Sequence, residues 1–185
     1  MNTPSPATEW VQLVDAQDRP TGRAEKLDAH RCALLHRAFS VFVFDAAGRL
    51  LLQRRADGKY HSGGLWTNTC CGHPRPDEGL IDAAKRRMRE EMGFDCPLEP
   101  VGSLHYRLPV IGDLTEHEFD HLLCGECETD PQPDPQEVSA WRRIAWPELM
   151  TEIAAAPDTF TPWLREILAR CRPAIETWID EHHAR

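Results

Sequence analysis

The stretch from Gly72 to Phe94, GHPRPDEGLIDAAKRRMREEMGF, places acidic and basic side chains at spacings that suit the binding of a diphosphate. A carboxylate such as that of Glu91 is an oxygen ligand of the kind that Mg²⁺ prefers. Arg87 lies four residues before Glu91, and its guanidinium offers a planar pair of donors to phosphate oxygens. The pattern predicts that Arg87 and Mg²⁺ on Glu91 hold a diphosphate together. The alternative is a surface helix with ordinary ion pairs, each stabilising it by about 0.3–0.5 kcal/mol.

A second group of residues has the composition of a metal site. Its members are three histidines and two glutamates: His30, His36, His73, Glu116 and Glu118. In a strand, the two glutamates would point to the same face. Mixed imidazole and carboxylate ligands suit a divalent metal. Spacing alone leaves two other interpretations open, namely structural or surface histidines and the solvated face of an edge strand.

The elements that would position these residues form an α/β mixture. We expect strands over residues 10–15, 38–45, 50–55, 65–71, 101–110, 116–128 and 138–146, and helices over 79–92, after Pro147 and over 160–182. Residues 38–45 and 50–55 should form a hairpin. An apolar stripe at spacings of three and four predicts the first helix, and Gly93 should end it. Pro173 should break the last one.

Length and composition predict the domain organisation and exclude several kinds of partner. The 185 residues indicate one domain over 10–183, with a flexible N-terminus over 1–9. A net charge of −9 without a basic run argues against nucleic-acid binding, and no apolar run suggests a membrane span. Seven cysteines, an odd number, without a secretion signal favour reduced thiols and a cytoplasmic location. We expect a monomer or a weak homodimer.

The spacing of the first stretch resembles the Nudix box, a loop–helix–loop in which glutamates hold Mg²⁺ against a diphosphate. The matching positions are Gly72, Glu78, Arg86, Met88, Glu90, Glu91, Gly93 and Phe94. Arg87 departs from the pattern of the Nudix hydrolases, which have a glutamate there. The exchange removes one carboxylate and adds a guanidinium, which favours holding a diphosphate over cleaving it.

Longer segments of the sequence resemble the type 1 isopentenyl diphosphate isomerases. These segments are LHRAFSVFVF, QRRADGKYHSGGLWTNTCCGHP, RRMREEMG, EHE and TPW. The resemblance extends from about residue 10 to about residue 170. That family has a Nudix-like fold, a mixed sheet flanked by helices, and it converts isopentenyl diphosphate to dimethylallyl diphosphate. It also has arginine at the position of Arg87.

The resemblance implies a role for each candidate residue. Metal ligands would be His30, His36, His73, Glu116 and Glu118, for Mn²⁺ or Mg²⁺, with Zn²⁺ also chemically reasonable. A diphosphate-bound Mg²⁺ would use Glu91 and the backbone of Cys71. Catalytic residues would be Cys71, Glu118, Tyr106 and Trp163. Cationic contacts to the small-molecule diphosphate would be Lys26, Arg55, Lys59 and Arg87.

The implied chemistry needs these residue types. Moving a double bond through a tertiary carbocation takes two acid/base groups on opposite sides of the substrate, for which Cys71 and Glu118 are the candidates. A nearby cation should depress the pKa of the Cys71 thiol. Trp163 could face the carbocation with its indole ring, although core packing is the plainer interpretation. Trp66 could help to close the pocket against water.

Two other functions remain open from the sequence. A Nudix hydrolase would release phosphate, and Arg87 argues against it. A diphosphate-binding module without catalysis would have no use for Cys71 and Glu118 as an acid/base pair.

Overall fold

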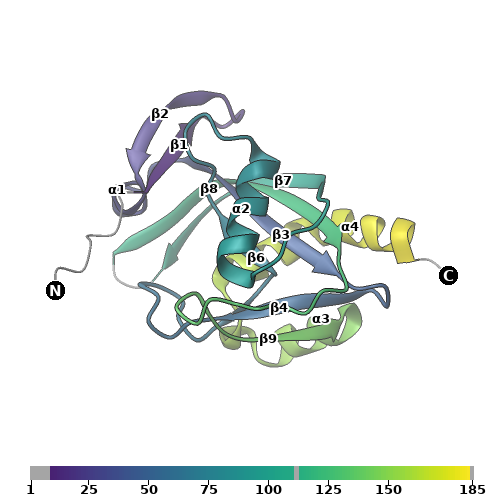
Figure 1. Cartoon of the computed structure of the whole chain (residues 1–185). Coiled ribbons are helices and arrows are strands. Elements are labelled where there is room, and N and C mark those ends of the chain that lie inside the picture. Colours follow the sequence, from purple (N-terminus) through teal and green to yellow (C-terminus); the bar gives the residue numbers. More distant parts are fainter. Residues whose placement is uncertain (1–8, 111–112, 184–185) are drawn as a thin grey trace.

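A mixed sheet with helices on both faces makes up the protein, as expected (Figure 1). The computed structural model describes residues 9–110 and 113–183, so the expected flexible N-terminus lies, except for Glu9, outside the described residues. The strands within this part are β1 (Trp10–Val14), β2 (Pro20–Glu25), β3 (His36–Phe44), β4 (Arg49–Arg55), β5 (Trp66–Thr67), β6 (Cys70–Gly72), β7 (Glu99–Val110), β8 (Leu114–Glu126) and β9 (Val138–Ala145). The helices are α1 (Lys26–Arg31), α2 (Leu80–Met92), α3 (Trp146–Ala155) and α4 (Pro162–His183), with a 3-10 turn at Pro157–Thr159.

Strand β3 is the centre of the sheet because it pairs with β1, β4, β6 and β8. Its pairing with β8 is parallel and sets His36 opposite Glu118. Its antiparallel pairing with β6 sets Ser40 opposite Cys71. These registers bring residues that are distant in the sequence to one face of the sheet, since side chains two residues apart share a face.

Both faces of β3 are covered, which explains its nearly continuous apolar sequence. Phe42 and Phe44 belong to the core that includes side chains of α3 and α4. Val41 and Val43 point the other way and pack with Met88 of α2. Figure 1 shows α2 in front of the sheet and α4 behind it. The two helices thus lie on opposite sides of the strand that carries the registers.

Most of the expected elements are present, but the predicted break at Pro173 is wrong. Helix α4 runs through Pro173, which lies on its exposed side. The carbonyl that loses its intrahelical donor belongs to the exposed Ala169, so water can satisfy it. Leu168 and Ile175 are buried on either side of the proline and hold the helix against the core. Packing therefore outweighs the local preference.

Three other features differ from the expectations. Strand β2 and helix α1 had no predicted counterpart. The hairpin at 38–45 and 50–55 exists, with Phe44 opposite Leu50 next to its turn, while β4 pairs along its length with β9. The strand expected over 65–71 is two short strands, because the chain crosses from β4 to β3 between them.

Gly93 ends helix α2 as predicted, with a φ of 76°, in the left-handed region. A Cβ built at Gly93 would lie 2.5 Å from the carbonyl oxygen of Gln132. We expect Gly93→Ala to lower the free energy of unfolding in urea by more than the roughly 1–2 kcal/mol of left-handed strain. Gly58→Ala is the control, because nothing lies within 4 Å of its Cβ position. Equal losses in the two variants would contradict this explanation.

Candidate active site

Most of the predicted site residues line one cavity of about 480 Å³. Its walls come from β1, β2, α1, β3, β4, β6, α2, β7, β8 and α4. The predicted residues that line it are Lys26, His30, Arg55, Lys59, Cys71, His73, Arg87, Glu91, Tyr106, Glu116, Glu118 and Trp163. His36 does not line the cavity but is fully buried beside His73. The tertiary structure therefore brings the two groups of candidate residues into one site.

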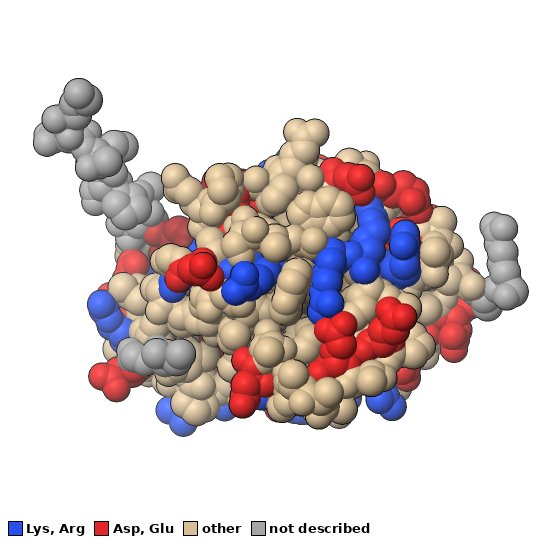
Figure 2. Space-filling view, turned by 90° about the horizontal axis from the view of Figure 1, so that it is seen from below, with Lys and Arg blue, Asp and Glu red and all other residues tan. Residues whose placement is uncertain are grey.

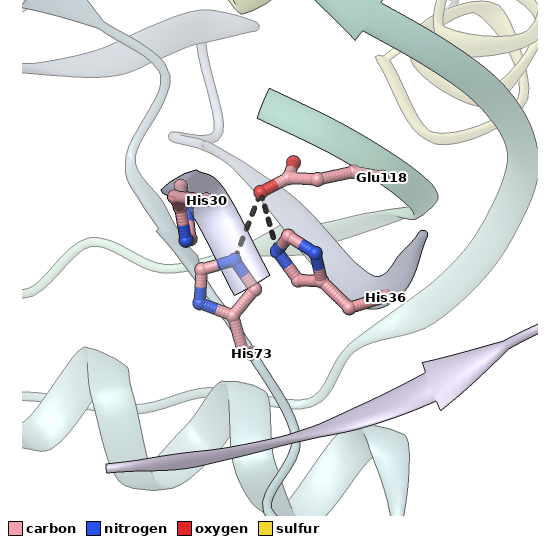
Figure 3. Close-up of side chains that lie close together, drawn as sticks. All are labelled: His30, His36, His73 and Glu118. Atoms are coloured by element: carbon pink, nitrogen blue, oxygen red, sulfur yellow. Dashed lines mark hydrogen bonds and ion pairs between the residues drawn. The ribbon is translucent and has the colours of Figure 1, made fainter. Parts of the chain in front are cut away.

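The predicted metal ligands converge on one point (Figure 3). Ligand atoms of His30, His36, His73 and Glu118 all lie within 4.8 Å of one another. His73 Nε2 lies 2.8 Å from Glu118 Oε1, and His36 Nε2 lies 3.6 Å from the same oxygen. Glu116 joins the cluster through His30, with 3.2 Å between Nε2 and Oε2.

Two of these histidines are oriented as metal ligands usually are. His30 Nδ1 lies 2.7 Å from the carbonyl oxygen of Lys26, and His36 Nδ1 lies 2.8 Å from that of Leu34. A ring that donates its Nδ1–H to a carbonyl turns the lone pair of Nε2 inward. His36 Nε2 is buried with no hydrogen-bond partner among the described residues. The donor set therefore fits a divalent metal ion.

The two glutamates of this cluster differ in their electrostatic environment. Burial and the negative charge of Glu118 raise the pKa of Glu116. Burial also opposes ionisation of Glu118, but His36 and His73 point ring nitrogens at it and lower its pKa well below the usual value. Burial lowers the pKa of His73 to about 3. Glu118 is thus an ionised carboxylate beside the neutral imidazole of His73, in the state that binds a cation.

Tyr106, a predicted catalytic residue, lies beside Glu118. The pairing of β7 with β8 sets the two residues opposite each other, and the Tyr106 hydroxyl donates a hydrogen bond to Glu118 Oε2. Burial raises the pKa of Tyr106 well above its ordinary value, so the hydroxyl keeps its proton. Tyr106 therefore supports the ionised form of Glu118.

Cys71 is held by neighbours that its sequence position did not reveal. Its thiol donates to Asn68 Oδ1 at 3.1 Å, and Ser40 Oγ lies 3.7 Å from its sulfur. Ser40 in turn donates to the buried Asp120 at 2.8 Å. The amide of Asn68 is fixed by two backbone carbonyls, those of Val41 and Cys70. These contacts fix the direction in which the thiol points.

The expected depression of the Cys71 pKa is wrong. Burial and the nearby Asp120 raise the pKa of the thiol to about 12. The cations of the cavity do not offset this, since Arg87 and Lys59 are already paired with Glu91 and Glu137. Cys70 points to the opposite side of the strand and packs into the core.

The four predicted cations line the cavity, and three of them, Lys26, Lys59 and Arg87, form ion pairs. Arg87 pairs with Glu90 at 2.6 Å and with Glu91. Lys59 pairs with Glu137, and Lys26 pairs with Glu9 at 2.7 Å. On the face seen in Figure 2, Lys and Arg side chains form small groups flanked by Asp and Glu. Positive charge is thus local in a chain whose net charge is −9.

Trp163 belongs both to the core and to the cavity wall. Its side chain is 4% exposed, and the Arg55 guanidinium lies 5.1 Å from the ring centroid. Core packing is therefore confirmed, and a role of the indole ring opposite the carbocation stays a prediction. Trp66 is not among the lining residues; its ring lies 4.6 Å from the guanidinium of Arg142, and its role in closing the pocket stays a prediction.

Several residues of the site were not predicted from the sequence. Asp120 follows Glu118 by two positions, so strand alternation could have placed it on the same face. Asn68, Glu137 and His61 gave no such signal, because loops or distant strands bring them to the cavity.

Comparisons with known proteins agree with this geometry. The model of the NUDIX domain matches residues 34–171. An isopentenyl-diphosphate Delta-isomerase of Burkholderia multivorans is 55% identical over 92% of this chain and 97% of its own length. An enzyme of the same name from Streptomyces griseus is 49% identical over 89% of this chain and 84% of its own.

The chain belongs to the isopentenyl-diphosphate Delta-isomerase family, on a NUDIX domain.

Solved structures show the same fold at low identity. A crystal structure from Deinococcus radiodurans superposes with a TM-score of 0.72 at 19% identity, over 88% of this chain and 99% of that one. A Nudix hydrolase from M. smegmatis has a TM-score of 0.56 at 19% identity, over 91% of this chain and 94% of that one. Among the described residues of this family member, no helix has the length and apolar character of a membrane span.

The raised pKa of Cys71 can be tested by its alkylation. Because the thiolate is the nucleophile, a thiol whose pKa is about 12 should react with iodoacetamide about tenfold faster per pH unit from pH 7 to 10, without a plateau. Mass spectrometry of digests gives the rate at each cysteine. Cys32, which is exposed, reports on the reagent in the same sample. A plateau in the Cys71 rate below pH 9 would contradict the raised pKa.

Proposed function

We propose that this chain interconverts isopentenyl diphosphate and dimethylallyl diphosphate. The observation that carries the proposal is that Cys71 and Glu118, from β6 and β8, line one cavity with cations and Glu91. Those cations and Glu91 suit a diphosphate, and the acid/base pair suits a hydrocarbon whose double bond moves. Family membership supports the same reaction.

The protonation of the two groups is complementary. The raised pKa of Cys71 leaves a proton on the sulfur, and the lowered pKa of Glu118 leaves a carboxylate. A proton added to the terminal alkene carbon produces a tertiary carbocation, and loss of a proton from the neighbouring methylene produces the other alkene. Trp163 offers its indole ring to the carbocation without attacking it. Burial of the reacting end keeps water from quenching the cation.

Two metal ions would complete the site. His30, His36, His73, Glu116 and Glu118 would hold Mn²⁺ or Mg²⁺, with Zn²⁺ as a further candidate. Glu91 and the backbone of Cys71 would hold a Mg²⁺ that binds the diphosphate. When bound, these ions supply positive charge that balances the buried carboxylates and the diphosphate.

The cations would hold the diphosphate by displacement of their acidic partners. Arg87, Lys59, Lys26 and Arg55 line the same cavity as Glu91. In the free protein Glu90, Glu137 and Glu9 pair with three of them, and a diphosphate would take the place of these carboxylates, which are partly exposed and can turn to water. Arginine is suited to this because its planar fork binds phosphate oxygens at two points.

The hydrolase and the binding module are the two alternatives. A hydrolase lacks support because Arg87 pairs with Glu91 where a further carboxylate would be needed. A binding module would not need the hydrogen bonds that hold Cys71 and Glu118 in place, because it transfers no proton.

One experiment separates the three functions. Proton NMR of the protein with isopentenyl diphosphate and Mg²⁺ in D₂O, with free phosphate assayed in parallel, should show dimethylallyl signals, deuterium incorporation and no phosphate. Phosphate release without isomerisation would support the hydrolase. Substrate binding without either product would support the binding module.

Cys71→Ala should abolish isomerisation, because the proposed acid/base pair loses one of its two members. The NMR assay measures turnover, and circular dichroism checks the fold. Cys70→Ala is the matched control, since its sulfur lies in the core on the other face. Normal turnover by Cys71→Ala would remove Cys71 from the mechanism.

Arg87→Glu should weaken binding of isopentenyl diphosphate about 10- to 100-fold, because a charge-assisted hydrogen bond of about 1.5–3 kcal/mol is lost and repulsion is added. Calorimetric titration measures the affinity. Arg89→Glu carries the same charge change on the same helix, but Arg89 is exposed and pairs with Asp95. Equal affinities for Arg87→Glu and Arg89→Glu would refute the proposed contact.

A further inference from the structure

His61 is a buried imidazole in the cavity to which neither the sequence patterns nor the proposed mechanism assigns a role. Its side chain is 5% exposed, and it lines the same cavity as Cys71 and Glu118. It lies outside the ligand set of three histidines and two glutamates. A buried polar ring in contact with that set calls for a physical explanation.

The loop that carries His61 is tightly closed. Arg55 and Leu65 are joined by a backbone hydrogen bond of 3.0 Å, which closes the loop between β4 and β5. Ser62 has a positive φ of 51°, and a Cβ at Gly63 would lie 2.6 Å from the carbonyl oxygen of Asp57. This backbone leaves little freedom at the loop's inner side, where His61 is buried.

Both nitrogens of the His61 ring have partners. Nε2 lies 3.1 Å from Glu116 Oε1, and Nδ1 lies 3.4 Å from Ser62 Oγ. Because a carboxylate oxygen accepts, the ring proton belongs on Nε2, which faces Glu116 Oε1, and the Ser62 hydroxyl donates to Nδ1.

Glu116 is therefore held from two sides. Its Oε1 faces His61, and its Oε2 faces His30 at 3.2 Å. His30, His61 and Glu116 form a second compact group of ligand atoms that shares His30 with the first group. Without His61, one oxygen of this buried carboxylate would lack its neutral donor, and the side chain could turn away from the metal position.

The same residue also contacts the wall that would face the hydrocarbon. The His61 ring lies 5.7 Å from the Trp163 ring at an interplanar angle of 84°. The backbone oxygen of His61 accepts from Arg55 Nη2 at 3.3 Å, and the Arg55 guanidinium lies over Trp163. His61 thus touches the metal cluster, Trp163 and one of the diphosphate cations.

We propose that His61 is a positioning residue of the metal site, which donates from Nε2 to Glu116 and holds that carboxylate in place to bind the divalent ion. The proposal rests on the metal site of the proposed function. Hydrogen-bonded partners of metal ligands typically contribute 10- to 100-fold to metal affinity. His61 has the burial, the distance and the donor needed for that effect.

The test is Mn²⁺ binding by the metal-stripped full-length protein without substrate, measured by electron paramagnetic resonance of the free ion. His61→Leu should weaken binding about 10- to 100-fold. His61→Gln should bind within a few-fold of the unchanged protein, because its amide nitrogen reaches the place of Nε2. His61→Asn should bind weakly, because its shorter amide ends near Nδ1.

A matched control removes an imidazole elsewhere. His105→Leu changes an exposed histidine of β7, and it should leave Mn²⁺ affinity at the cavity unchanged. Unfolding in urea checks each variant. If His61→Leu does not fold, the difference in Mn²⁺ affinity between the Gln and Asn variants still tests whether His61 positions Glu116. A role in folding alone would not make Mn²⁺ affinity follow the position of the amide.

Two results would overturn the proposal: unchanged affinity in His61→Leu, or equal affinities in the Gln and Asn variants. Because Mn²⁺ binding is measured without substrate, its outcome is separate from that of the isomerase assay. Normal Mn²⁺ binding in a protein that does not isomerise would count against the proposed function and leave the role of His61 in place.

Discussion

The burial of two carboxylates side by side on one strand is the constraint on which the site depends. Glu116 and Glu118 share a face of β8 and are each at most 6% exposed. Burying an isolated carboxylate is very costly unless it is paired and hydrogen-bonded. Imidazoles from α1, β3 and the residue after β6 approach these oxygens, with the Tyr106 hydroxyl from β7. A site of this charge favours a bound cation.

The pairing of β3 explains how that constraint is met without losing the core. One face of β3 carries His36 and Ser40 toward the cavity and then Phe42 and Phe44 toward α3 and α4. Its other face packs against α2, the helix that supplies Arg87 and Glu91. A single strand therefore sets the metal ligands, the neighbour of Cys71 and the helix of the diphosphate site in one rigid frame.

Opposite charges are balanced differently at the two ends of the cavity. Histidines face carboxylates at the metal cluster, where Glu118 stays ionised. Cations face carboxylates at the diphosphate site, where Arg87 and Lys59 are paired before any ligand arrives. Cys71 lines the same cavity, and burial beside Asp120 keeps its proton on the sulfur. This charge distribution separates the histidine and glutamate cluster, which suits a metal ion, from the cationic part of the cavity, which suits a phosphate.

The sequence by itself determined the family, the local elements and most of the residues that meet in the cavity. Three features depend only on neighbours a few residues away in the sequence: the apolar run of β3, the helix that ends at Gly93 and the alternation of Glu116 and Glu118. Such features can be predicted from a short stretch of sequence. Only the tertiary structure decided the unbroken α4, the raised pKa of Cys71 and the place of His61. Each of these depends on burial and on partners from distant strands and loops, and a linear pattern does not contain those contacts.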